Sequence, residues 1–351
     1  MENKSGIVSI SFPFVAGVCA AALARQPFAG ALVGSAATAA LICMCAASRK
    51  RCTPQITLLF FFLGAFCWCS RALCPAPPLK PPTHAIDALT KLLESIPFRG
   101  EHSGAIIEAL LTGRRGGLPR DTVAAFRKSG ASHILALSGL HLGVIYACIG
   151  RILKPMGNSP AVRLLRSAAT IALCGFYTLA TGASPSIVRA FLFIVINETG
   201  RALSGRAHSP LGTFCTALTL QLALRPETIA SVGFQLSYLA MLGITLLYPR
   251  LERWYPGTGR ADPVRYVWKC AALSISCQLF TAPVAWWHFR SLPLYFLITN
   301  LIALPLTELI IIGALASAVL QATLGCPQTL ADAVGSLVET LEFCLETIAS
   351  I

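Results

Sequence analysis

Residues 133–150 read HILALSGLHLGVIYACIG, and this stretch decides the fold class. Most of it is apolar enough to lie in lipid, where a spanning helix needs about 20 mostly apolar residues. His133, Ser138 and His141 interrupt the apolar run with polar groups. A polar side chain inside the hydrocarbon must face protein or a water-filled cavity. We therefore predict a membrane helix over residues 131–153 with a polar face that is turned inward.

The composition extends this prediction to the whole chain. The sequence has 351 residues, of which 55% are hydrophobic and 12% are charged, whereas soluble domains are about 25% charged. We expect an all-α, polytopic helical membrane protein with about ten apolar segments, some of them broken or re-entrant, plus interfacial amphipathic helices. The first run reads as a retained span, because it lacks a basic leader. The segments are residues 10–24, 27–47, 56–73, 131–153, 163–181, 186–199, 209–224, 228–249, 267–289 and 292–320.

The formal net charge of +13 has two explanations. Excess Lys and Arg can reflect cytoplasmic loops and contact with lipid headgroups. They can also reflect a polyanionic partner such as nucleic acid. The basic cluster at residues 49–51 favours a cytoplasmic first loop, with the N-terminus on the same side. Residues 74–129 would then lie outside although they also carry several Lys and Arg, so either the topology is inverted or that region has its own reason to be basic.

The chain divides into four regions by composition. Residues 1–74 hold N-terminal transmembrane helices, and residues 75–103 hold a Pro-rich linker followed by an amphipathic helix. The linker sequence CPAPPLKPPTH cannot be helical throughout, because proline removes backbone donors. Residues 104–325 contain short helices and the remaining apolar segments. Residues 326–351 form a C-terminal amphipathic acidic helix, with an apolar stripe opposite its Asp and Glu side chains.

The polar residues of the opening stretch do not form an enzyme pattern. Ser138 and His141 share one helix face, but no acid partner or oxyanion donor accompanies them, so we predict no catalytic activity. His133 and His141 are eight apart and no C-x-x-C occurs, so we predict neither a metal nor a cofactor. Gly139 recurs with Gly143 and an alanine at every fourth position, which is typical of close helix packing. Whether the polar face lines a cavity or only bonds to a neighbouring helix is left open.

A second unusual stretch is ATGASPSIVRAF, residues 180–191. Ser184 can cap a helix that begins at Pro185. The apolar run from Ser186 to Thr199 is about 21 Å long as a helix, which is short of a hydrocarbon core of about 30 Å. We expect a half-helix whose free N–H groups, together with Arg189, attract a phosphate. The alternatives are that Arg189 pairs with Glu198 or Glu308, or that it snorkels to the headgroups.

Three later stretches contain further polar groups within apolar runs. VGFQLSYLAMLGI, from Val232, carries Gln235 and Ser237. LPLYFLITNLIALPLTELIII, from Leu292, carries Asn300, Pro305 and Glu308. We expect Pro305 to break this helix into two halves, and Glu308 to be paired with an arginine or protonated. Asn300 either bonds to the carbonyls that the break frees or lines a cavity. Trp286, Trp287 and His288 are typical of an interfacial belt.

At these residues the sequence resembles the ComEC family of DNA-uptake competence proteins. The matching blocks are LLTGRRGGLP, FRKSGASHILALSGLHLG, SPSIVRAFL, GFQLSYLAMLGI and LPLYFLITNLIALPL, in family order. The resemblance covers about residues 104–320. It implies a multi-pass inner-membrane channel component that takes up single-stranded DNA during natural transformation, with residues 104–325 as the competence (channel) domain.

The resemblance also implies partners and a set of path residues. Family members often carry an OB-like domain and a metallo-β-lactamase-like domain, and neither is recognisable in this sequence. We therefore expect membrane lipids and single-stranded DNA as partners, other competence proteins that supply the two domains, and a homo-oligomer as a further option. The alternatives are a transporter of a smaller anion and a non-conducting scaffold remnant of a longer protein. The candidates for the DNA path are His133, Ser138, Gly139, His141, Ser184, Ser186, Arg189, Gln235, Ser237, Asn300, Pro305 and Glu308.

Overall fold

The computed structural model describes residues 6–24, 27–47, 53–74, 83–157, 159–205, 209–255, 262–290 and 295–350. All regular secondary structure in these ranges is helical. The chain forms two compact units, Met1–Leu79 with Leu192–Tyr238, and Lys80–Phe191 with Leu239–Ile351. Most of the predicted linker and the basic cluster at residues 49–51 lie outside the described ranges.

The first unit is built on three long apolar helices, α1 (Gly6–Ala24), α2 (Pro27–Ala47) and α3 (Thr53–Leu73). Two glycines allow the backbones of α1 and α3 to touch. A Cβ on Gly17 would lie 1.9 Å from the Phe61 carbonyl oxygen, and one on Gly64 would lie 2.1 Å from the Phe14 carbonyl oxygen. Small residues permit such close crossings, in which van der Waals contact rather than water exclusion holds membrane helices together.

Hydrogen bonds attach α11 (Pro210–Leu224) to this three-helix group. The Ser11 hydroxyl of α1 donates to the Cys215 carbonyl oxygen at 3.2 Å, and the Thr219 hydroxyl donates to the Ser11 oxygen at 2.8 Å. The chain then continues through the short 3₁₀ helix η2 (Pro226–Ala230) into α12 (Val232–Leu246). Within lipid such hydroxyls are satisfied by a neighbouring helix, and these two bonds do so.

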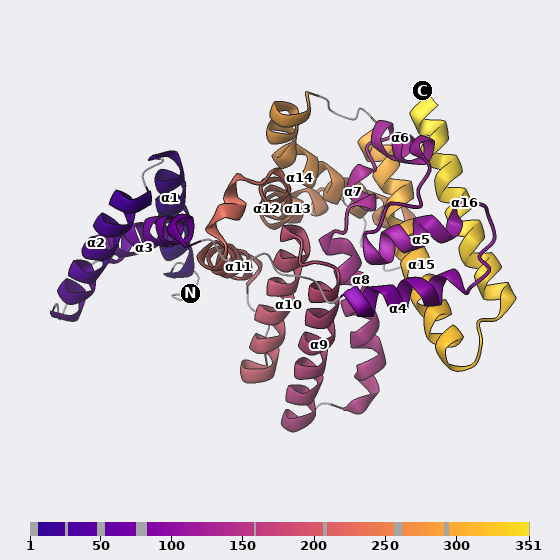
Figure 1. Ribbon diagram of the computed structural model, residues 1–351, viewed down its shortest axis with the longest axis horizontal. Coiled ribbons are helices and arrows are strands. Elements are labelled where there is room, and N and C mark those ends of the chain that lie inside the picture. The colour runs from indigo at the N-terminus through magenta and orange to yellow at the C-terminus, as the bar shows by residue number, and fades with distance from the viewer. Residues whose placement is uncertain are drawn as a thin grey trace. The chain divides into compact units, whose positions relative to one another are not determined.

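The second unit has a core made by short helices packed on two long ones. Helices α4 (Thr83–Glu94), α5 (Ser103–Thr112) and α6 (Arg120–Lys128) precede α7 (Ser132–Leu135), and the long pair is α15 (Phe296–Thr323) and α16 (Gln328–Ser350). Figure 1 shows α15 and α16 running side by side, and these two helices have an extensive contact. Helix α5 is buried along most of its length, including Ile106, Ile107, Leu110 and Leu111. The short helices therefore belong to the packed core of this unit.

Helix α16 places its apolar stripe against the core of the second unit. Its buried residues include Val334, Val338 and Leu341. A Cβ on Gly335 would lie 2.3 Å from the Arg99 carbonyl oxygen, so glycine is needed where the turn before α5 rests on the helix. The Glu342 carboxylate accepts a bond from the Thr122 hydroxyl of α6 at 3.2 Å.

The second unit contains several further helices. They are α8 (Gly139–Leu153), η1 (Lys154–Met156), α9 (Pro160–Ala180), the first turns of α10 (Pro185–Ser204), the end of α12, α13 (Tyr248–Glu252) and α14 (Pro263–Phe289). Helices α12 and α14 cross closely, because a Cβ on Gly243 would lie 2.2 Å from the Ser276 carbonyl oxygen.

Six helices of the described chain are long and apolar enough to cross a membrane. They are Gly6–Ala24, Pro54–Leu73, Pro160–Ala180, Val232–Glu252, Val264–Phe289 and Phe296–Thr323. The chain is thus an all-α polytopic membrane protein, as the composition predicts. The figure of about ten segments stays a prediction, since α2 and α11 are among the shorter apolar helices.

Two predicted helix boundaries are wrong. The stretch 131–153 is not one helix: α7 ends at Leu135, Ala136 is extended, and α8 begins at Gly139. The predicted half-helix at Ser186 begins at Pro185 as expected, but it continues to Ser204 as a 20-residue helix. The polar residues Asn197 and Glu198 made the apolar run look short, although they do not interrupt helical hydrogen bonding.

The predicted break at Pro305 is also wrong, because α15 is continuous from Phe296 to Thr323. Proline removes one backbone donor and usually kinks a helix. Here Ala303 and Thr307 on either side of Pro305 are buried in the core, and packing holds the helix together across the missing bond.

Candidate functional site

The start of α8 is fixed by a pair of side chains from the opening stretch. Ser138 is the N-cap residue, and its hydroxyl oxygen accepts a bond from the Leu140 N–H at 3.2 Å. The His141 ring reaches back, and its Nδ1 accepts a bond from the Ser138 N–H at 3.2 Å. This is a capping box in which histidine replaces the usual Glu or Gln. Ser138 and His141 therefore bond to each other within one helix end.

The capping box also assigns the tautomer of His141. Because Nδ1 accepts a bond from a backbone N–H, the neutral ring carries its proton on Nε2. The side chain is 1% exposed, and Nε2 has no hydrogen-bond partner among the described residues. A buried donor without a partner costs free energy, on the order of 1–3 kcal/mol. The site therefore contains a donor that a water molecule or a ligand oxygen would satisfy.

Gly139, the first residue of α8, receives the side chain of Arg189 from α10. A Cβ placed on Gly139 would lie 2.8 Å from Arg189 Nη2 and 3.2 Å from the Ala190 Cβ. The Ser186 carbonyl oxygen is 3.9 Å from the same point. Gly139 is thus the small residue that lets α10 approach α8. The other members of the predicted glycine face do not take part, since nothing lies within 4 Å of a Cβ on Gly143.

Two positive features meet at this point of the second unit. The N-terminus of α8 carries the positive end of the helix dipole, and Arg189 adds a fixed charge while being only 8% exposed. Helix N-termini with a neighbouring cation are favourable places for phosphate oxygens. Chemically, the arrangement is suited to holding an anion.

The other predicted residues of the second unit lie differently. His133 is exposed, and its Nδ1 lies 3.1 Å from the Gly130 carbonyl oxygen. The Ser184 hydroxyl does not act as the predicted cap: its oxygen is buried and has no hydrogen-bond partner among the described residues. Asn300 Oδ1 is likewise buried and unpartnered within that part of the chain. Glu308 is exposed on the surface of α15, so it is not placed among these packed polar groups.

Gln235 and Ser237 belong to the first unit, on the first turns of α12. The Gln235 amide donates to the Ile229 carbonyl oxygen of η2 at 2.9 Å, which is a local bond that shapes the start of the helix. The structure brings together Ser138, Gly139, His141, Ser186 and Arg189. The convergence of Gln235 and Ser237 with that group stays a prediction.

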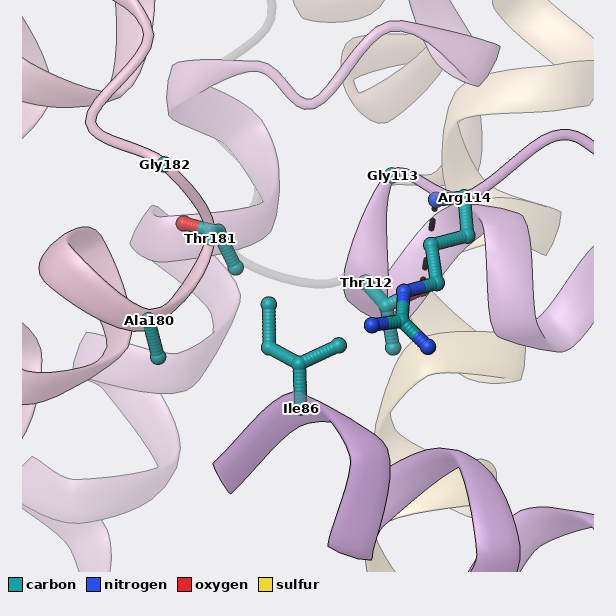
Figure 2. A pocket seen from close by; sticks show the side chains of 7 residues that line it. All are labelled: Ile86, Thr112, Gly113, Arg114, Ala180, Thr181 and Gly182. Atoms are coloured by element: carbon teal, nitrogen blue, oxygen red, sulfur yellow. Dashed lines mark hydrogen bonds between the residues drawn. The ribbon is translucent and has the colours of Figure 1, made fainter. Parts of the chain in front are cut away.

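A small pocket lies near the end of α5, about 170 Å³ in volume. Figure 2 shows the Ile86 side chain between two glycine turns, one at the end of α5 and one at the end of α9. Both Gly113 and Gly182 have positive φ, at 80° and 83°. Such left-handed residues end helices, and helix C-termini present negative carbonyl ends. The pocket lining is Ile86, Thr112, Gly113, Arg114, Ala180, Thr181 and Gly182.

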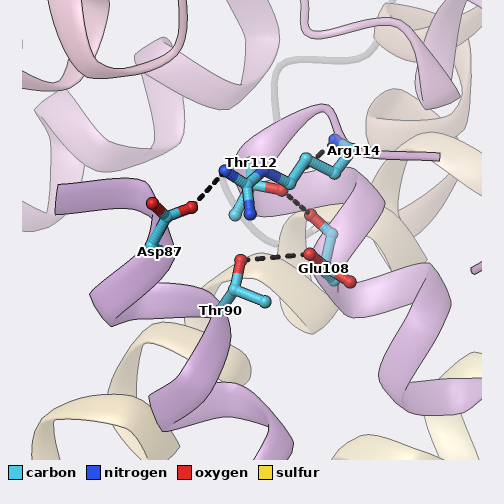
Figure 3. A network of polar contacts seen from close by, with 5 residues as sticks. All are labelled: Asp87, Thr90, Glu108, Thr112 and Arg114. Carbon is cyan, nitrogen blue, oxygen red and sulfur yellow. Dashed lines mark hydrogen bonds and ion pairs between the residues drawn. The ribbon is translucent and has the colours of Figure 1, made fainter. Parts of the chain in front are cut away.

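The cation of this pocket is already used in a structural network, which Figure 3 shows. The Arg114 guanidinium pairs with Asp87 of α4, and the Arg114 N–H donates to the Thr112 hydroxyl oxygen at 3.2 Å. The Thr90 hydroxyl donates to Glu108 Oε1 at 3.0 Å. These bonds tie α4 to the end of α5. Because the Arg114 charge is already paired, the start of α8 is the better candidate site.

Sequence reasoning missed the Asp87–Arg114 pair, although Arg114 lies in one of the quoted blocks. The two residues are 27 positions apart, and only the packing of α4 against α5 brings them together. The sequence does indicate the two helix ends that line the pocket, because the Thr-Gly dipeptides at residues 112–113 and 181–182 each end a helix.

Comparison with known proteins identifies the family. The family model described as "Competence protein" matches residues 110–351, which includes α7, α8, α10 and the candidate site. No solved structure matches the chain.

Several curated proteins are similar to this chain. ComE operon protein 3 of Bacillus subtilis is 28% identical over 222 residues, covering 62% of this chain and 26% of that protein. Recombination protein 2 of Haemophilus influenzae is 24% identical, covering 67% of this chain and 30% of that protein. Competence protein ComA of Neisseria gonorrhoeae is 29% identical, covering 60% and 30%. The chain thus spans less than a third of the length of these relatives, and by the family match it belongs to the competence protein family.

Proposed function

We propose that this chain forms the membrane-spanning part of a conduit for single-stranded DNA, located in the inner membrane and used in DNA uptake. Membership of the competence protein family and the six apolar helices support this role. The conduit has no catalytic task in this proposal. Its partners in this proposal are membrane lipids, single-stranded DNA and other competence proteins.

The observation that carries the proposal is the contact between Arg189 and Gly139. A phosphodiester that crosses a low-dielectric layer needs fixed positive charge and donors to replace its water shell. The buried guanidinium lies at the N-terminus of α8, and the Nε2–H of His141, which has no partner within the described part of the chain, belongs to the same helix end. These groups would bind the phosphates of the strand one after another as the strand moves through.

The test is a substitution series at Arg189 in a transformable strain that lacks its own competence channel. Arg189→Gln removes the charge, Arg189→Glu reverses it, and Arg189→Lys keeps the charge without the planar donors. A charge-assisted bond contributes about 1.5–3 kcal/mol, so we expect transformation to fall about 10- to 100-fold in Arg189→Gln and further in Arg189→Glu. Uptake of labelled single-stranded DNA and transformant counts measure the effect.

The matched control is Arg151→Gln, which removes an exposed arginine from the other end of α8. Membrane insertion and melting temperature are checked for every variant. Wild-type transformation by an inserted Arg189→Gln protein would refute the phosphate contact. The wild-type chain could fail to restore transformation and yet conduct small anions into liposomes, which would favour a transporter of a smaller anion. If it conducts neither, a non-conducting scaffold is favoured.

A further inference from the structure

The C-terminal end of α14 presents a dense group of exposed aromatic side chains. Trp286, Trp287 and Phe289 are 50%, 71% and 59% exposed, and Tyr295 at the start of α15 is 37% exposed. These residues lie where one candidate membrane span ends, at Phe289, and the next begins, at Phe296. Trp and Tyr rings accumulate at the headgroup level of a bilayer, because one edge is polar and the rest is apolar.

A cation completes the group. The Arg290 guanidinium lies over the Trp287 ring, with Cζ 5.6 Å from the ring centroid. A cation on an indole face is attracted by the ring quadrupole and keeps its charge, and its outer N–H groups are still available to an anion. Arg290 itself is exposed. The pair therefore presents donors beside a flat apolar surface.

The backbone at Arg290 supports a role for this side chain. Arg290 caps α14 in the left-handed conformation with φ of 52°, where glycine or asparagine is the favoured residue. Glycine would end the helix there without strain, because it has no Cβ to clash with the carbonyl. A strained residue that persists at an exposed helix end indicates that its side chain is used.

We infer that Trp287 and Arg290, together with Trp286 and Phe289, form a binding surface for an anionic phospholipid. The aromatic rings rest among the upper acyl chains, and the guanidinium of Arg290 bonds to the headgroup phosphate. The occupant is a lipid rather than a nucleic acid strand, because the cluster lies at the ends of two candidate spans and its exposed area is mostly aromatic and apolar. This surface is separate from Arg189 and is independent of the proposed conduit.

The experiment is quenching of tryptophan fluorescence by brominated lipids, on the whole purified chain in mixed lipid. Brominated phosphatidylglycerol and brominated phosphatidylcholine are compared at equal mole fraction. One cation near the surface contributes about 1 kcal/mol toward an anionic lipid, so we expect about a fivefold preference for phosphatidylglycerol. Bromine near the headgroup end of the acyl chain should quench more than bromine at its terminus.

The variants separate the lipid surface from helix capping. Arg290→Gly removes the guanidinium and relieves the left-handed strain, so its melting temperature should be equal or higher while the fivefold preference disappears. Arg290→Gln should also lose the preference, and Trp287→Phe should keep part of it, because a weaker cation–π contact remains. Arg127→Gln, which removes an exposed charge from α6 outside the candidate spans, should leave the preference unchanged.

Three outcomes would overturn the inference. One is that Arg290→Gly retains the preference for phosphatidylglycerol. Another is that a Trp286→Phe, Trp287→Phe double variant loses no quenching, since Trp68, Trp254 and Trp268 would then account for the signal. The third is that an oligo-dT strand, but not soluble glycerophosphate, protects these tryptophans from the brominated lipid, which would assign the surface to stacked bases.

Discussion

At the scale of single residues, two polar groups of the opening stretch turn out to serve a helix end. Ser138 and His141 look from their spacing like a face that bonds to another helix. In the structure they bond to each other and to the backbone of α8. The unusual residue is then Gly139, because its missing side chain makes room for Arg189.

A pair of alanine substitutions tests this. Gly139→Ala places a Cβ 2.8 Å from Arg189 Nη2, which can shift, and 3.2 Å from the Ala190 Cβ, so it should cost about 1 kcal/mol from overpacking. Gly143→Ala, four residues on, meets nothing within 4 Å and should stabilise α8 by about 0.5–1 kcal/mol through helix propensity. Thermal unfolding in lipid nanodiscs should give shifts of opposite sign. Equal stabilisation by both would show that Arg189 does not rest on Gly139.

At the scale of helices, close crossings at glycine organise each unit. Gly17 and Gly64 bring α1 and α3 into backbone contact, and Gly30 and Gly34 lie along the contact between α2 and α3. The tighter of these crossings is the one between α1 and α3, which uses two glycines from different helices. No local motif announces such a pair.

Glycine-to-alanine changes should rank these crossings. Gly64→Ala would bring a Cβ to 2.1 Å from the Phe14 carbonyl oxygen. Because this oxygen belongs to the backbone of α1, it cannot move away unless α1 and α3 separate. We expect a loss of about 1–3 kcal/mol or more. Gly34→Ala, also buried, meets its nearest atom at an ordinary 3.4 Å and should change stability little. Melting curves of the two variants in the same lipid decide the point, and a similar small effect of both would contradict the crossing.

At the scale of the whole molecule, the protein combines a strongly basic charge with membrane-spanning helices. The chain has a net charge of +13, six helices of its described part are apolar enough to cross a membrane, and Arg189 is buried. Contacts with a nucleic acid backbone release counterions, so their strength depends steeply on salt.

Retention of a fluorescent oligo-dT strand by the purified chain should therefore fall as salt is raised. Each phosphate contact contributes about 0.7 to the slope of log affinity against log salt for a single strand, so Arg189→Gln should reduce the slope by about that amount. Fluorescence anisotropy over a salt series measures both slopes. Competition by sulfate at equal ionic strength, or a slope that is identical in the two proteins, would argue for a small-anion site.

The sequence by itself determined the class of the protein and most of its helices. Apolar runs of about 20 residues with few charges predict membrane helices, and helix starts such as Pro185 are set by local chemistry. It also singled out Arg189, because an arginine within an apolar helix is costly without a purpose. The break between α7 and α8, the continuity of α15 through Pro305 and the full length of α10 were decided by tertiary packing and capping contacts.

Tertiary structure alone joined residues that are distant in the chain. Gly139 meets Arg189, Asp87 meets Arg114, and Gly17 meets the backbone beside Gly64. The physical reason is that helical periodicity determines which side of a helix is apolar, but not which other helix covers it. That choice depends on shape complementarity over the whole core, which no local pattern encodes.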